Sequence, residues 1–249
     1  RASGAGNLAA WRRENVTALV RAVHDTVKAA DPTLRFGISP QGNPDNDENQ
    51  QYSDVPGWLA SGGEDAVVDY LCPQVYWGQG FALHNGSTRF AFENIVPAWL
   101  AYPRAADVAL YFGLGAYRVG VGDGGSNENS LSGWSTGRAL ADQVAFLREQ
   151  GAGGWALYRY GSLFGPEQTS LAAAECGALA AADGQENASK SVGGGGGPPT
   201  AKKLHKIGRQ RAQKPGGSLV RCCKMRYTIQ MDPALPEPEK TGTSNPLTG

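Results

Sequence analysis

Apolar residues recur along the first 182 positions in alternating helical and extended patterns. Four short apolar runs have the length and composition of strands, at 34–40, 67–77, 108–118 and 153–160. Helical spacing occupies 8–30, 54–61, 89–101, 135–150 and 168–182, with polar loops expected at 41–53 and 120–133. Strands that alternate with helices in this way predict βα units around a parallel sheet.

The run at 67–77 changes character toward its end. It begins with apolar residues, as expected of a strand covered on both faces, and finishes with Gln74, Tyr76 and Trp77. In parallel α/β folds, ligands bind where strands end at their carboxyl side. We therefore expect a polar and aromatic binding surface at this point.

The number of βα units limits the choice of architecture. An intact (β/α)8 TIM barrel takes about 250 residues, whereas the pattern here stops near position 182. We predict an α/β fold of the TIM-barrel type, represented by its C-terminal half of about four βα units, with the first four strands upstream of Arg1. A complete small doubly wound domain is the alternative that the pattern leaves open.

Composition divides the chain into two predicted segments. Residues 1–184 carry a formal charge of −7 and residues 185–249 one of +7, so the neutral total hides two unlike parts. We assign 1–184 to the barrel segment and predict that 185–249, rich in Gly, Pro and basic residues, is disordered. An acidic body and a basic tail too poor in apolar residues for a core predict no nucleic-acid partner.

Cysteine and histidine spacing gives no sign of a metal or cofactor. Four cysteines occur, but none forms a C-x-x-C pair or lies near a histidine at ligand spacing. The segment Gly113-Leu114-Gly115 lacks the helix that opens a dinucleotide-binding loop, so close packing within a strand is the better interpretation. We expect no cofactor and no metal.

Four blocks in order resemble a known family. They are Trp11-Arg12-Arg13-Glu14-Asn15-Val16, Phe36-Gly37-Ile38-Ser39-Pro40, Val68 to Trp77, and Tyr111 to Arg118. Together they resemble the C-terminal half of the family 10 glycosyl-hydrolase-like domain, which is distinct from the family 10 xylanases, over about residues 8–165. The resemblance implies a TIM barrel and hydrolysis of a bacterial cell-wall or extracellular polysaccharide.

The resemblance also implies that a main catalytic carboxylate is absent. In that family the strand before the Trp-Arg-Arg helix carries the candidate acid, and this chain starts after it, so we expect the acid upstream of residue 1. The alternative function is a noncatalytic carbohydrate-binding or cell-surface interaction module. A metal-dependent deacetylase is a third hypothesis, which no His/Asp ligand set supports.

Acidic side chains near the expected strand ends do not form a convincing catalytic pair, so the catalytic residues are unknown. Asp69 lies near the N-terminal end of its strand, where a hydrogen-bonding role is favoured. Asp45, Asp47 and Glu48 follow the strand at 34–40 on the correct side, but a solvated loop is the simpler interpretation.

Aromatic and amide side chains at the strand ends are better candidates for binding than for bond cleavage. Aromatic rings stack on sugar faces, and an amide offers both a donor and an acceptor to hydroxyl groups. The competing interpretations are loop packing for Tyr76 and Trp77, a turn for Asn43, and a tether to Asp123 for Arg118. The candidate substrate-binding residues are Asn43, Gln74, Tyr76, Trp77, Tyr117, Arg118, Tyr158 and Tyr160.

The end of the chain suggests a location. Asn245-Pro246-Leu247-Thr248-Gly249 resembles a variant of a sortase sorting motif, which predicts attachment to a cell wall, although an unstructured end explains it equally well. We expect an extracellular or cell-surface protein whose partner is a polysaccharide or oligosaccharide.

Overall fold

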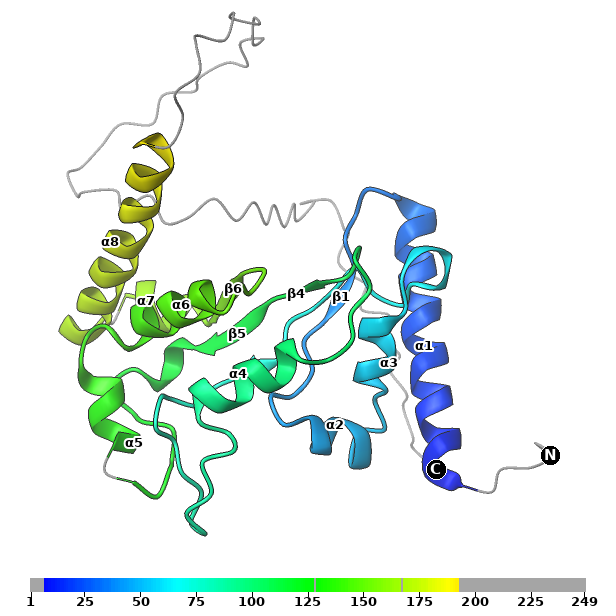
Figure 1. The fold of residues 1–249 in the computed structure, drawn as a ribbon, viewed down its shortest axis with the longest axis horizontal. Coiled ribbons are helices and arrows are strands. Elements are labelled where there is room, and N and C mark those ends of the chain that lie inside the picture. Colours follow the sequence, from blue (N-terminus) through cyan, green and yellow to red (C-terminus); the bar gives the residue numbers. More distant parts are fainter. Residues whose placement is uncertain (1–6, 128, 167, 193–249) are drawn as a thin grey trace, which may run out of the picture.

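The computed structural model describes residues 7–127, 129–166 and 168–192, and its short strands form two three-stranded sheets (Figure 1). The first sheet has the order β1-β2-β4 and the second the order β3-β5-β6, with every pair parallel. The strands are β1 (Gly37–Ile38), β2 (Tyr70–Leu71), β3 (Gln74–Val75), β4 (Ala109–Leu110), β5 (Phe112–Gly115) and β6 (Trp155–Tyr158). The predicted parallel α/β architecture is confirmed. A closed barrel is not formed by the described residues, and the assignment to half a TIM barrel stays a prediction.

The five helices that the pattern predicted occur in the predicted order, and three further short α-helices in the described residues were not predicted. In Figure 1, α1 stands at one end of the molecule with α3, and α8 stands at the other end with α7. The α-helices are α1 (Leu8–Ala30), α2 (Pro44–Asn49), α3 (Val55–Ala60), α4 (Phe92–Leu100), α5 (Asn129–Ser132), α6 (Ala139–Glu149), α7 (Tyr160–Phe164) and α8 (Ser170–Val192). Short 3-10 helices are η1 (Gly63–Asp65), η2 (Ala116–Arg118) and η3 (Gly133–Ser135). No helix within the described ranges is both long and apolar enough to cross a membrane.

The long strands predicted at 67–77 and 108–118 are each divided in two. Pro73 separates β2 from β3, because proline has no N–H to donate to a neighbouring strand. Its carbonyl still accepts a hydrogen bond from the Gly113 N–H at 2.8 Å, and the Leu71 carbonyl accepts one from Tyr111 at 2.9 Å. These hydrogen bonds continue the pairing between β2 and β4 into that between β3 and β5, so the two runs are parallel neighbours although the strands are shorter than predicted.

Three other predicted boundaries are wrong. The polar loop at 41–53 contains α2, which Asn43 caps and Pro44 opens. The last predicted strand, 153–160, ends at Tyr158, and Tyr160 begins α7. The last helix, predicted to end at 182, continues to Val192. The part of the predicted disordered tail from 193 to 249 lies outside the described residues.

Side chains on the outer face of the strands form the core with the helices. Leu71, Val75, Phe112 and Leu114 alternate along their strands and are fully buried. They face helical side chains that include the buried Trp99 of α4. Since alternate residues of a strand point to opposite faces, the intervening residues lie on the inner face.

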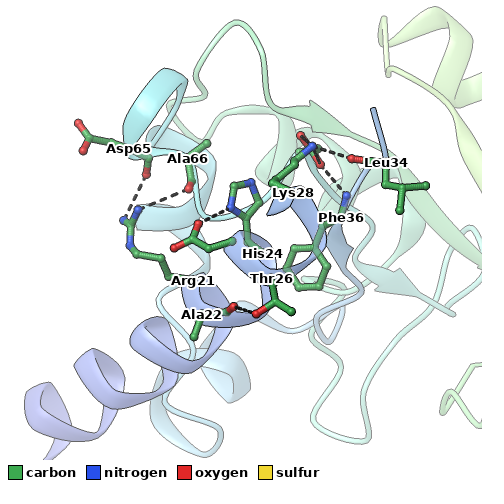
Figure 2. Close-up of polar contacts among 11 residues, drawn as sticks. Arg21, Ala22, His24, Thr26, Lys28, Leu34, Phe36, Asp65 and Ala66 are labelled. Atoms are coloured by element: carbon green, nitrogen blue, oxygen red, sulfur yellow. Dashed lines mark hydrogen bonds and ion pairs between the residues drawn. The ribbon is translucent and has the colours of Figure 1, made fainter. Parts of the chain in front are cut away.

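Polar contacts anchor α1, which has no buried residue, to the rest of the fold (Figure 2). Lys28 donates to the Leu34 carbonyl at 2.6 Å and pairs with the Asp69 carboxylate at 2.8 Å. Burial opposes ionisation of Asp69, but hydrogen bonds from Lys28 and the Phe36 N–H, with the charge of Lys28, lower its pKa overall. Asp69 therefore has the hydrogen-bonding role predicted for it. Arg21 donates to two carbonyls of the segment before β2.

Candidate functional site: a tyrosine triad at the strand ends

Three tyrosines from different strand ends meet on the inner face. Tyr76 follows β3, Tyr117 lies in η2 directly after β5, and Tyr158 ends β6. The Tyr76 and Tyr158 rings are stacked, with centroids 5.8 Å apart and planes at 19°. Tyr117 stands edge-on to both, at 5.6 Å from Tyr76 and 6.2 Å from Tyr158. These three residues are called the tyrosine triad below.

Glycine in the middle strand allows this stacking. Gly115 pairs with Tyr158 on one side, and a Cβ placed on it would lie 3.2 Å from the Cβ of Tyr76 on the other. Strands are about 4.8 Å apart, so rings from the two outer strands can stack only over a middle strand without a side chain. Gly113, two residues earlier in the same strand, lies between Gln74 and Ala156 of the neighbouring strands. The two glycines are therefore explained by close packing, as the sequence predicted.

The three rings of the triad are exposed to different degrees. Tyr158 is 54% exposed, whereas Tyr76 and Tyr117 are half-buried. Burial, followed by the neighbouring Cys72, Tyr117 and Tyr158, raises the pKa of Tyr76 to about 12. Tyr76 is thus a neutral phenol at physiological pH, with an apolar ring face and a hydroxyl that is both a donor and an acceptor.

Gln74 shares the inner face with Tyr76, but its amide is already engaged. Its Nε2 donates to the Ser39 carbonyl at 3.0 Å. The side-chain oxygen remains able to accept a hydrogen bond. Asn43 lies earlier in the chain, in the loop after β1, where its side chain accepts from the Asp45 N–H at 3.1 Å and caps α2.

Trp77 points away from the triad. Its ring stacks on Phe90 at 4.9 Å and contacts Phe81 at 5.9 Å. A Cβ on Gly42 would meet the indole at 2.7 Å, so Trp77 packs under the loop after β1. Trp77 therefore packs against a loop, which was the alternative to sugar binding, and it does not join the triad.

Tyr160 is also separate from the triad, although the sequence grouped it with Tyr158. It belongs to α7, its ring packs on Phe164 at 5.1 Å, and it is 74% exposed. The strand ends two residues earlier than expected, so the inward alternation that would have included Tyr160 does not reach it.

Arg118 and Asp123 do not form the predicted tether. Arg118 donates through Nη1 to the Gly122 carbonyl at 3.3 Å, and its guanidinium lies 4.8 Å from the Tyr117 ring centre. Asp123 instead accepts from Gly78 and Trp134 through one oxygen, at 2.8 and 2.9 Å. Its other oxygen accepts from Gly125 and Ser130. Asp123 therefore joins the loops that follow β3 and β5.

The acidic residues after β1 differ from one another. Asp45 pairs with Arg89 at 2.6 Å, and Glu48 lies 4.0 Å from Arg13, both at the surface. Asp47 is 1% exposed, so its prediction as a solvated loop residue is wrong. The fold of α2 buries it, with Oδ1 accepting from the Gln41 N–H at 3.0 Å. A buried carboxyl group cannot contact a polymer in this conformation.

Sequence reasoning missed two buried acids that organise the site's surroundings. One is Asp123 with its four hydrogen bonds. The other is Glu175 of α8, which is fully buried and accepts from the Ala139 and Leu140 N–H groups at 2.7 and 3.0 Å. Those N–H groups open α6 and have no partner within their own helix. Glu175 has no local sequence signal, because both of its partners lie in a distant segment. Asp123 has a local partner in Gly125, but its hydrogen bond from Gly78 also depends on a distant segment. No cluster that could hold a metal occurs among the described residues.

Comparisons with known proteins relate this chain to glycosyl hydrolases. A family model described as Glycosyl hydrolase-like 10 matches residues 3–129, which include Tyr76 and Tyr117. The chain is 30% identical over 158 residues to glycosyl hydrolase YngK of Bacillus subtilis (strain 168), a match covering 57% of this chain and 28% of that protein. It is 28% identical over 124 residues to glycosyl hydrolase DigH of Escherichia coli (strain K12), covering 44% and 26%. The chain thus spans about a quarter of the length of these curated relatives.

Proposed function

Because the chain belongs to the Glycosyl hydrolase-like 10 family, we propose that its tyrosine triad is the sugar-binding wall of a glycoside hydrolase acting on cell-wall or extracellular polysaccharide. The observation that carries this proposal is the convergence of Tyr76, Tyr117 and Tyr158 at the carboxyl ends of parallel strands. In barrel and doubly wound folds, this is the side on which substrates bind.

The chemistry of the triad fits a saccharide. A sugar ring has an apolar face of C–H groups bordered by hydroxyls, and an aromatic ring that covers such a face removes up to about 150–250 Å² from water. The Tyr158 ring is sufficiently exposed to stack on a ligand, while the hydroxyls of the triad and the oxygen of Gln74 would accept or donate at its edge. Binding and orientation are the roles that we assign to these side chains.

Bond cleavage requires carboxyl groups that we place outside the described residues. Glycosidases use two carboxyls about 5–5.5 Å apart for retention or about 6.5–9.5 Å apart for inversion. In the described ranges, the acids nearest the strand ends are committed to other partners, as with Asp123, or buried, as with Asp47. We therefore propose that other parts of the protein supply the catalytic acids.

The same observation favours a second candidate function, a noncatalytic carbohydrate-binding or cell-surface module. Such a module needs the tyrosine triad but no carboxylate pair. An assay for new reducing ends released from polysaccharide distinguishes the hydrolase from the noncatalytic module. Any form of the protein that contains residues 1–249 can be used. Cleavage supports the hydrolase, and binding without cleavage supports the module. An extracellular or surface location accompanies either proposal; the sorting-like motif at 245–249 lies outside the described residues.

A matched pair of tyrosine variants tests the sugar-binding wall. Tyr76→Ala is expected to weaken binding to the preferred oligosaccharide in isothermal titration calorimetry by about tenfold or more, equivalent to about 1.4 kcal/mol. Tyr160→Ala removes the same side chain outside the triad and should leave affinity unchanged. Equal effects of the two substitutions, or none from either, would refute the role of the triad.

A further inference from the structure

We propose that the saccharide bound on the tyrosine triad carries a carboxylate, as uronic acids do, and that Arg118 and Arg159 recognise it. The inference rests on the proposed function and specifies its substrate class. Arg118 directly follows Tyr117, and Arg159 directly follows Tyr158. Each of these two strand ends therefore presents a tyrosine followed by an arginine.

Arg118 keeps a hydrogen-bond donor that a ligand can reach. Nη1 donates to the Gly122 carbonyl at 3.3 Å, and Nε is buried without a hydrogen-bond partner within the described part of the chain. In the same residues Nη2 donates no hydrogen bond and, unlike Nε, is not buried, so it is the nitrogen that a carboxylate can approach. A hydrogen bond from this charged donor to a carboxylate is stronger than one between neutral groups.

Neither arginine has an acidic partner. Over residues 7–127, 129–166 and 168–182, no carboxylate lies within ion-pair distance of Arg118 or Arg159. Asp123, the nearest acid along the chain, takes its four hydrogen bonds from other residues. Elsewhere, positive side chains do pair with acids: Arg13 with Glu48, Lys28 with Asp69, Arg89 with Asp45, and Arg138 with Asp142.

The two arginines come from segments that pack together. Arg159 is exposed and caps the start of α7, and α7 packs against η2, which ends at Arg118. Tyr117 and Tyr158 lie on these same segments with their rings 6.2 Å apart. Each arginine thus directly follows a triad residue, on two segments in contact, and the guanidinium of Arg118 lies 4.8 Å from the Tyr117 ring centre. Burial raises the pKa of Tyr76 to about 12, so this member of the triad supplies no competing charge.

The positive charge of the two arginines contrasts with the net charge of the segment that carries them. Residues 1–184 have a formal charge of −7, which would repel an anionic polymer from most of the surface. Arg118 and Arg159, which have no acidic partner among the described residues, would instead attract a carboxylate near the triad. Arginine is suited to this role because its planar fork matches a carboxylate, which the ammonium of lysine does not.

The test compares ligands that differ only in charge. The 249-residue chain is titrated by calorimetry with oligomers of galacturonate, glucuronate and mannuronate, and with their methyl esters. We expect at least one free acid to bind about tenfold more tightly than its ester, with the difference shrinking as salt is raised. Arg118→Gln and Arg159→Gln should each reduce this difference, because they weaken binding of the free acid more than binding of the ester. Arg118→Lys should recover only part of the difference, and Arg12→Gln, on α1, should change nothing.

Each contrary outcome is distinct. Equal affinity for acid and ester would overturn the carboxylate inference while leaving the sugar-binding wall intact. A preference for the acid that persists in the Arg118→Gln, Arg159→Gln double variant would overturn the assignment to these residues. Binding of none of the acids or esters would overturn the inference; if neutral glycans of other compositions also fail to bind, the proposed function fails with it.

Discussion

Replacing Asp47 by asparagine is expected to remove a pH-dependent contribution from the free energy of unfolding. Asp47 is 1% exposed, and of its two carboxyl oxygens only Oδ1 has a partner, the Gln41 N–H at 3.0 Å. Oδ2 is buried without a hydrogen bond in the described structure. Burial raises the pKa of Asp47 from 3.8 to about 6, and the hydrogen bond from Gln41 opposes the rise only in part.

The direction of the effect follows from proton binding. A carboxyl group with a higher pKa in the folded state binds protons more tightly there, so acid stabilises the fold relative to the unfolded chain. The contribution is fully present below pH 3.8 and is lost as the pH rises through about 6. A difference of about two pH units corresponds to about 3 kcal/mol, because each unit is worth about 1.36 kcal/mol.

Urea unfolding of the natural chain and Asp47→Asn, followed by circular dichroism between pH 4 and 7.5, measures this contribution. Other titrating groups are common to both proteins and cancel in the difference. As the pH rises from 4 to 7.5, the free energy of unfolding of the natural chain should fall by about 2–3 kcal/mol relative to that of the variant. Most of this fall should occur below pH 6.5. A difference that stays constant with pH would refute the account of Asp47.

Three further predictions concern packing and association. Gly115→Val should weaken oligosaccharide binding about tenfold or more in calorimetry, because even a Cβ there would approach Tyr76 to 3.2 Å and Arg118 to 3.1 Å; unchanged affinity would contradict the stacking geometry. Glu175→Ala should lower the free energy of urea unfolding by about 1–3 kcal/mol, since it leaves two N–H groups of α6 without an acceptor, and a loss below about 0.5 kcal/mol would be the contrary result. The chain should self-associate with rising concentration in sedimentation velocity, because β1 and β6 each pair with one strand in the described sheets; a monomer at every concentration that melts cooperatively would contradict the half-barrel prediction.

Much of the fold follows from hydrophobic periodicity. The alternation of Leu71 and Val75 with polar positions, and of Phe112 and Leu114 with glycines, defines an outer face that the helices bury. The same alternation places the inner-face residues of neighbouring strands together. Element ends were harder to predict, because the division of the strand at Pro73 depends on which N–H groups find partners across the sheet.

Some of the local errors had usable signals. Asn43 followed by Pro44 is typical of a helix start, with a side-chain cap and a proline in the first turn, and it indicated α2 within the predicted loop. Period-two alternation also separates Tyr76 from Trp77, because adjacent strand residues face opposite ways. The burial of Asp47 had no such signal, since it depends on how α2 packs against distant segments.

The stacking of Tyr76 on Tyr158 could be predicted only in outline. Both were expected at strand ends, but their contact across a middle strand requires the register that sets Gly115 opposite Tyr158. Tyr160 was grouped with them because nothing in the sequence marks the end of the strand at Tyr158. Long-range register and strand length are thus the two quantities that local patterns left undetermined.

The central claim is that saccharide binds on the tyrosine triad, and ring resonances of the tyrosines test it most directly. In chain labelled with ¹³C on tyrosine rings and titrated with its preferred oligosaccharide, the resonances of Tyr76, Tyr117 and Tyr158 should shift together with a single affinity. Those of Tyr52 and Tyr160, outside the triad, should stay in place. Saturating binding that leaves the three triad resonances unmoved would contradict the account.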